Sequence, residues 1–143
     1  MNLNELKIFL KKSQPFKELS ENELNNLTNN SFLKEINIGE RIIEFNKIPE
    51  FIPLLISGSL RLLVLDENQN PITLEKIKET KLLGWSVILR GKCEISIIAS
   101  SKSKILLIPS MFFISILDNT NIKKYISQAS LEEVYSIFNI ANI

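Results

Sequence analysis

The chain has 143 residues with 17 basic and 16 acidic side chains, a net charge of +1, a single cysteine and no histidine. This balance excludes a global positive field that attracts nucleic acid or anionic lipid, and the missing histidine removes the usual general base and the commonest metal ligand. The single Cys93 excludes a disulfide framework, and every apolar run ends well before the ~18 residues of a membrane span, so we expect a cytoplasmic chain without metal, cofactor or membrane contact.

Two short helices are expected at the N-terminus, over residues 3–12 and 20–29. Apolar residues recur at helical spacing in both segments. Ser20 and Glu23 form the capping-box pattern that starts the second helix. The first residues lack the basic start and uncharged apolar stretch of a secretory signal, so we expect them to belong to the fold.

From Ser31 the apolar period changes from helical to alternating. Short strands at regular intervals, with turn residues such as the Asp- and Asn-rich segment 66–70 between them, favour an antiparallel sandwich or barrel. The strands are predicted at 32–38, 41–45, 51–65 with an interruption at Gly58, 71–77, 94–100 and 104–109.

Helical spacing returns at Ser110. We expect helices over 110–117 and from Asn119 onward, and Ser130 with Glu133 predicts a further helix or a bend. The apolar positions of the helix from Asn119 are Ile122, Tyr125, Ile126 and Ala129. Those of the last segment are Leu131, Val134, Tyr135 and Phe138, and this stripe packs on a downstream domain, on a second copy as a homodimer, or back on the barrel.

The order of these elements resembles the cyclic-nucleotide-binding domain, the sensor of catabolite-activator type regulators, cyclic-nucleotide-dependent kinases and gated channels. The resemblance is carried by "INIGERIIEF" at 36–45, "PLLISGSLRLLVLDENQ" at 53–69, "LGWSVILRG" at 83–91 and "KILLIPSMFFISIL" at 104–117. It implies an α+β fold: a small antiparallel β-barrel of the double-stranded β-helix or jelly-roll type with N-terminal helices, a short cassette helix and C-terminal helices. It also implies one domain, with N-terminal helices in 1–30, the barrel in 31–109 and C-terminal helices in 110–143.

The glycines agree with this resemblance, because all four stand where the family pattern has glycine. Where a further glycine would follow the second strand, the chain has Asn46. Asparagine is the best substitute for glycine in a left-handed conformation, so we expect that conformation there.

The phosphate-binding cassette is the decisive segment. In the family, backbone N–H groups at the start of a short helix and an arginine bind the cyclic phosphate, and a glutamate at the head of the cassette binds the ribose 2′-hydroxyl. The resemblance places Gly84 at the turn. It places the amides at the following positions, which are Trp85, Ser86, Val87 and Ile88.

The two side chains that select a cyclic nucleotide in the family are replaced. Trp85 stands at the glutamate position and Glu94 at the arginine position, so a carboxylate would face the phosphate with like charge. Losing such an arginine costs ~2 to 5 kcal/mol when the partner charge is buried. The sequence therefore predicts that cyclic AMP does not bind in the family's manner.

Three residues leave alternatives open. Arg90 either turns into the pocket to hold an anion or stays in solvent at a helix C-terminus, where the dipole favours a cation. Ser96 either donates a hydrogen bond to a phosphate or is an ordinary strand hydroxyl. Trp85 either stacks on a flat ligand or closes the pocket.

These observations predict a non-enzymatic regulatory or sensor domain for a small anionic or nucleotide-like ligand, without nucleic-acid contact. The string "GWSVILRGKCEISIIAS" is similar to degenerate sensor domains at the N-terminus of cyanobacterial ABC transporters that export peptides, which implies the cytosolic regulatory part of an exporter. One alternative is the sensor half of a catabolite-activator type transcription regulator. Another is a metal-dependent cupin-like enzyme, whose sites are built largely from histidine.

Overall fold

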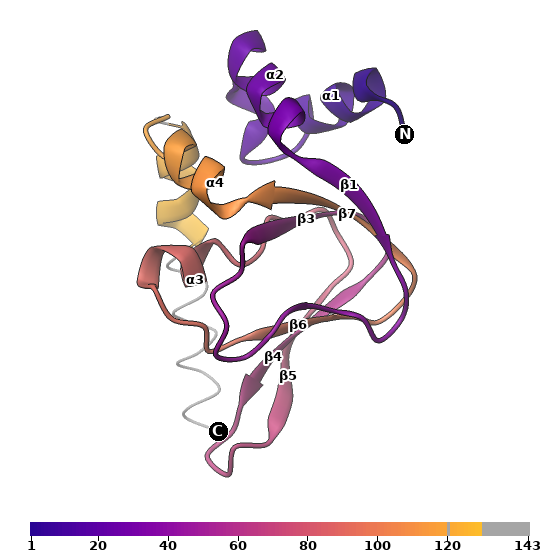
Figure 1. The fold of residues 1–143 in the computed structure, drawn as a ribbon, viewed down its shortest axis with the longest axis vertical. Coiled ribbons are helices and arrows are strands. Elements are labelled where there is room, and N and C mark those ends of the chain that lie inside the picture. The colour runs from indigo at the N-terminus through magenta and orange to yellow at the C-terminus, as the bar shows by residue number, and fades with distance from the viewer. Residues whose placement is uncertain (120, 130–143) are drawn as a thin grey trace.

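The computed structural model describes residues 1–119 and 121–129. Three helices and a 3-10 turn flank seven strands, and a short helix interrupts the strands (Figure 1). In chain order these are α1 (Leu3–Lys11), η1 (Phe16–Glu18), α2 (Glu21–Asn30), β1 (Phe32–Ile36), β2 (Arg41–Ile43), β3 (Phe51–Ser57), β4 (Leu60–Leu65), β5 (Pro71–Ile77), α3 (Trp85–Arg90), β6 (Ser96–Ala99), β7 (Ser103–Pro109) and α4 (Ser110–Ile116). A further helix occupies residues 121–129.

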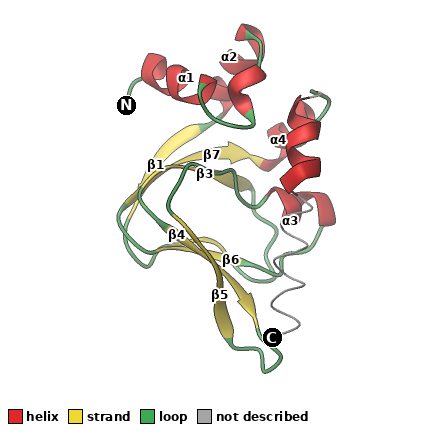
Figure 2. Cartoon of the chain, turned by 180° about the vertical axis from the view of Figure 1, so that it is seen from behind, coloured by secondary structure: helices red, strands yellow, loops and turns green. Residues whose placement is uncertain are grey.

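The strands form two antiparallel sheets, one of three strands in the order β1-β7-β3 and one of four in the order β2-β6-β4-β5. Figure 2 shows the two sheets facing each other, with α1, α2 and α4 on the side of the three-stranded sheet. The predicted α+β class with a jelly-roll-like core is confirmed. The barrel, however, is not closed, because no ladder among the strands of residues 1–119 joins the two sheets at their edges.

The predicted helix start at Ser20 is confirmed. The Glu23 amide donates to Ser20 Oγ over 3.2 Å, and the Ser20 amide donates to Glu23 Oε1 over 2.9 Å. Asn2 and Glu5 form a second capping box at α1 that the sequence reading missed. Glu23 also accepts a hydrogen bond from Asn119 Nδ2 over 3.0 Å, which ties α2 to the residue that caps the helix of 121–129.

Two apolar cores lie on opposite faces of the three-stranded sheet. Leu54 and Leu106 belong to the core under the helices, whereas the adjacent Leu55 and Ile105 belong to the core between the sheets. Strands β3 and β7 are thus buried on both faces, which explains why their sequences are apolar at nearly every position instead of alternating.

Local backbone conformation follows the prediction at two turns. Asn46 adopts φ +64°, so the predicted left-handed asparagine is confirmed. The 66–70 turn is closed by the Asp66 side chain, which accepts from the amides of Asn68 and Asn70 at 2.9 and 2.8 Å. The sequence reading missed η1 and the positive φ of Gln69.

Gly58 provides a first prediction. At φ +103° an added Cβ would lie 2.6 Å from Ser103 Cα, whereas at Gly39, with φ +88°, nothing lies within 4 Å. We expect Gly39→Ala to lower the free energy of unfolding by about 1 to 2 kcal/mol, the cost of a left-handed non-glycine residue. Gly58→Ala should cost clearly more in chemical denaturation, and equal losses would contradict the steric argument.

Glu23 provides a second prediction. Hydrogen bonds, first from the Ser20 amide and then from Asn119, hold the pKa of Glu23 below its ordinary 4.5. A carboxyl whose pKa is lower in the folded than in the unfolded state stabilises the fold when the pH is above its pKa in the unfolded state. This stabilisation is lost as the pH falls through its pKa in the folded state. Acid titration of stability should therefore be flatter below about pH 4.3 in Glu23→Gln than in the unmodified chain. An equal slope in Glu23→Gln and in the unmodified chain would contradict this role of Glu23.

Candidate functional site

Residues 81–83 bring the chain to the site by pairing with β3. The Leu55 amide donates to Lys81 O over 3.1 Å, and the Leu83 amide donates to Pro53 O over 2.9 Å. The chain then turns at Gly84, where φ is +80° and a Cβ would lie 2.6 Å from Ile43 Cδ1. A side chain at Gly84 would therefore be strained by the left-handed conformation, and it would require Ile43 to move its terminal methyl.

The short helix predicted between the two glycines is confirmed as α3. Its C-cap Gly91 is left-handed, and the Gly91 amide donates to Val87 O over 2.9 Å. The Val87 amide donates to Gly84 O over 3.2 Å, and the Val87 side chain is buried between the sheets. Ile88 packs against the core under the helices, so Val87 and Ile88 anchor α3 on two sides.

A pocket of about 160 Å³ lies between α3 and the inner face of β4 and β5. Of the predicted site residues, Gly84, Trp85 and Ser86 line it. Its other lining residues are Leu62, Leu74, Glu75, Lys81, Leu82, Leu83, Ile95 and Ala129. Small-molecule pockets usually measure about 300 to 1,000 Å³, so this one suits only a small ligand.

One ion pair supplies charge to the otherwise apolar pocket. Lys81 Nζ lies 2.7 Å from Glu75 Oε1, and both side chains are about two-fifths exposed, so the pair sits at the mouth. A ligand there would meet one anionic and one cationic group. Within the described ranges, no group of three His, Cys, Asp or Glu is placed to hold a metal ion.

Trp85 forms part of the core. Its side chain is 7% exposed and belongs to the cluster that joins α1, α2, β3, β7 and α4. Ile126 and Ala129 pack against the same cluster, and Ile122 is fully buried. The predicted apolar face of the helix from Asn119 is thus confirmed at these three positions, and Trp85 and Ala129 meet at the pocket wall.

Arg90 and Glu94 lie outside the pocket lining. Arg90 Nη2 contacts Glu94 Oε2 at 3.3 Å, and Lys92 Nζ contacts Glu94 Oε1 at 3.2 Å, with all three side chains about half exposed or more. The hydrogen bond from Lys92 is the main cause that lowers the pKa of Glu94, with a smaller contribution from Arg90. Arg90 therefore pairs with its own chain at the surface.

Ser96 faces the opposite side of its sheet. Ile97 points into the core between the sheets, so its neighbour Ser96 points outward. Its buried hydroxyl donates to Ile43 O over 2.9 Å and accepts from Arg41 Nη1 over 3.3 Å. This hydroxyl links β6 to β2 and does not line the pocket.

Most of the pocket wall was not identified from the sequence, and a β-bulge explains two of the residues that were missed. Leu62 pairs with Glu75 and Leu63 with Thr73, so Leu74 is an extra residue on β5. Leu74 and Glu75 consequently both line the pocket, although strict alternation would put them on opposite faces. Leu62 and Leu74 could have been found from the sequence, because both are apolar positions of predicted strands that point between the sheets. No sequence signal identified Glu75.

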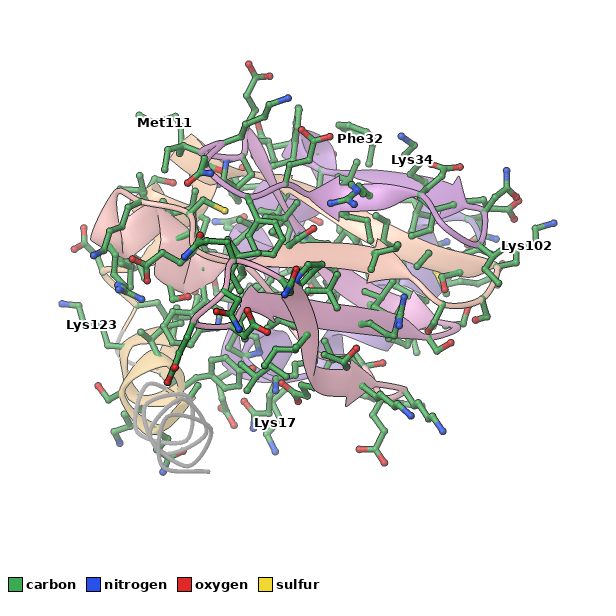
Figure 3. The ribbon with its side chains drawn as sticks, turned by 90° about the horizontal axis from the view of Figure 1, so that it is seen from below. Lys17, Phe32, Lys34, Lys102, Met111 and Lys123 are labelled. Atoms are coloured by element: carbon green, nitrogen blue, oxygen red, sulfur yellow. The ribbon has the colours of Figure 1, made fainter. Side chains whose placement is uncertain are left out.

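A second pocket, of about 180 Å³, opens at the edge between the sheets. Ile36 and Ile105 form part of its floor, and Lys34 and Glu50 are among the charged residues around it. Figure 3 shows Lys34 beside Phe32 on β1. None of the predicted site residues lines this pocket.

No family model and no curated protein matches this sequence. Solved structures do resemble the model. The regulatory domain of Toxoplasma gondii PKA with cAMP gives a TM-score of 0.79 at 14% identity, over 90% of this chain and 49% of that chain. The sensor domain of the transcriptional regulator DNR from Pseudomonas aeruginosa gives 0.76 at 16% identity, over 98% and 94%. Thermus thermophilus Catabolite Activator Protein gives 0.70 at 15% identity, over 88% and 62%.

The chain has the cyclic-nucleotide-binding domain fold. It spans about half of the Toxoplasma chain but nearly all of the Pseudomonas sensor domain. In this fold α3 is the counterpart of the cassette helix that the resemblance predicted. Among the described residues, no helix has both the length and the apolar character needed to cross a bilayer.

Trp85 provides a third prediction. It is the only tryptophan of the chain, so its fluorescence reports on the pocket wall. Trp85→Ala should lower the free energy of unfolding by about 3 to 5 kcal/mol, because it leaves a cavity in the core. Leu89→Ala on the same helix, where the side chain is 47% exposed, should change it by no more than about 0.5 kcal/mol. Similar losses in urea denaturation would show that Trp85 is not a core residue.

Proposed function

We propose that this chain is a non-enzymatic regulatory domain that senses a small ligand in the pocket beside α3. The observation that carries the proposal is the composition of the pocket wall. Gly84, Trp85 and Ser86 come from the turn and α3, while Ala129 comes from the helix of 121–129. A ligand that contacts both segments links pocket occupancy to the position of the C-terminal helix, which is a known way of transmitting binding to a neighbouring domain.

The residues present do not fit a cyclic nucleotide held in the family's manner. The position expected for a ribose-binding glutamate carries Trp85, whose ring is part of the core. The position expected for the phosphate-binding arginine carries Glu94, which pairs with Lys92 and Arg90 at the surface. The pocket volume of about 160 Å³ also favours a ligand smaller than a nucleotide.

The proposed ligand is a small molecule with an apolar body and one polar or anionic end. Leucines, Ile95 and Trp85 supply the apolar surface, and Lys81 supplies a cation at the mouth. Glu75 holds that cation at 2.7 Å, so an anionic group would have to displace or share it. Arg90 and Ser96 are not part of this site, because both are engaged elsewhere.

We propose two kinds of larger protein to which such a domain could belong. The resemblance of the cassette to exporter sensor domains supports a cytosolic regulatory part of a peptide-exporting ABC transporter. The likeness to the DNR sensor domain supports the sensor half of a transcription regulator instead. The two are distinguished by the gene downstream of Ile143, where a peptidase with membrane spans or a helix-turn-helix would be encoded. The homodimer stripe from Leu131 to Phe138, with the Ser130 capping box, lies outside the described residues.

Cyclic AMP binding tests the divergence of the site. We expect isothermal titration calorimetry to give no affinity tighter than about 1 mM for the unmodified chain, because no guanidinium faces the phosphate position. Two matched variants are compared for cyclic AMP affinity. Glu94→Gln removes the carboxylate alone, whereas Glu94→Arg removes the carboxylate and adds a guanidinium. Submicromolar affinity of the unmodified chain would contradict the proposal.

The pocket itself is tested by filling it. In a thermal-shift screen of small carboxylates and apolar metabolites, a ligand of this site raises the melting temperature and changes Trp85 fluorescence. The variant Leu74→Trp, which fills the pocket, should abolish both responses, whereas Leu65→Trp on the neighbouring hairpin strand should retain the thermal shift. A response that survives Leu74→Trp, or turnover of the compound, would contradict a sensing pocket.

A further inference from the structure

The outer face of the four-stranded sheet carries a row of cations in direct cross-strand register. Arg41 of β2 lies opposite Ile98 of β6, Ile98 lies opposite Arg61 of β4, and Arg61 lies opposite Lys76 of β5. Residues paired in this way share one face, and neighbouring strands lie about 4.8 Å apart. Three of the four strands therefore present a cation at one level, and we call these three residues the basic row.

Ile98 and Arg61 face away from both apolar cores, whereas Arg41 lies at the edge of the sheet and also lines the second pocket. Ile97, Ala99 and Leu60, next to row positions along β6 and β4, are buried between the sheets, so Ile98 and Arg61 point outward. Arg41 reaches Ser96 Oγ, which lies on the same outer face. Among the described helices, α2 and α4 pack on β7 of the other sheet, and Figures 1 and 2 show α1, α2 and α4 on that side.

The charge of the row is not neutralised within the described part of the chain. None of Arg41, Arg61 and Lys76 forms an ion pair with a carboxylate of residues 1–119 or 121–129. Glu44 is near enough for Arg41 to contribute to its lowered pKa, but its main partner is Lys47, at 2.6 Å. Two of the three arginines in a chain with 17 basic residues thus stand on one sheet face, and neither forms an ion pair within the described residues.

The number of charges on this surface and its composition distinguish three possible binding partners, which are a nucleic acid, an anionic membrane and a polypeptide. Nucleic-acid sites neutralise about 6 to 10 phosphates, and anionic membranes are recognised by clusters of about 4 to 8 basic residues. Three cations in a chain of net charge +1 fall short of both. The half-buried Ile98 adds apolar surface between the charges, which suits a polypeptide with alternating side chains.

We propose that the basic row is a docking surface for an acidic, extended polypeptide segment of a partner. Arg41 and Arg61 lie two strand spacings, or about 10 Å, apart. Each guanidinium donates two hydrogen bonds to one carboxylate of the segment, and Ile98 contacts the residue between the two carboxylates. The surface lies on a different sheet face from the pocket beside α3. It is therefore independent of the proposed sensing function.

The test uses a defined probe and the full chain. The probe is a fluorescein-labelled decapeptide in which glutamate alternates with threonine and valine, measured by fluorescence anisotropy. We expect salt-sensitive binding that weakens about fivefold in Arg61→Gln and about tenfold in Arg61→Glu or Arg41→Glu. The control variants Lys17→Glu and Lys123→Glu alter exposed lysines that Figure 3 shows on other parts of the molecule, and they should bind within twofold of the unmodified chain.

Amide chemical shifts locate the bound peptide and test folding of each variant in the same spectra. Changes confined to β2, β4, β5 and β6 support the proposal. Four results overturn it: no binding at millimolar peptide, shifts centred on the helices, equal losses in the control variants, or equally tight binding of phosphatidylserine vesicles or single-stranded DNA. Because Arg61 is partly exposed, Arg61→Gln is expected to keep the fold even if Arg41→Glu, which loses the bond to Ser96, does not.

Discussion

The burial of β3 and β7 on both faces is the constraint on which the rest of the structure depends. One face of these strands needs a cover of helices and the other needs a second sheet, because their side chains are apolar at almost every position. The residues after β5 extend this doubly covered sheet by pairing with β3, and α3 starts where that pairing ends. The position of the pocket thus follows from the way the central strands are buried.

The fold was largely predictable from the sequence because its signals are local. Capping at Ser20 and the Asp66 turn act through neighbours within a few residues, and the left-handed conformations of Asn46, Gly84 and Gly91 follow from the residue type. The openness of the barrel was not predictable, because closure depends on hydrogen bonding between strands that are distant in the sequence. The order of motifs indicated the architecture, but it contained no information on whether the edge strands of the two sheets pair with each other.

The candidate site was less predictable than the fold. Of the predicted site residues, Gly84, Trp85 and Ser86 line the pocket, because they lie at or directly after the left-handed turn that brings the chain to it. Ser96 and Arg90 were open questions, and their partners Ile43 and Glu94 became visible only once the strands and the end of α3 were placed in space. Tertiary packing also decides the environment of Trp85, since the core that surrounds it draws on six elements besides α3.

Because of the bulge between β4 and β5, a residue of the pocket wall can change without a loss of stability in the sheet. By turning two consecutive side chains toward the pocket, it sets a charged residue, Glu75, beside an apolar one, Leu74, without lengthening the ladder on either side. Glu75 is partly exposed and lies at the mouth, so its replacement changes what the pocket attracts and leaves the core intact. Natural variation at this one position therefore changes the charge at the pocket mouth on an unchanged scaffold.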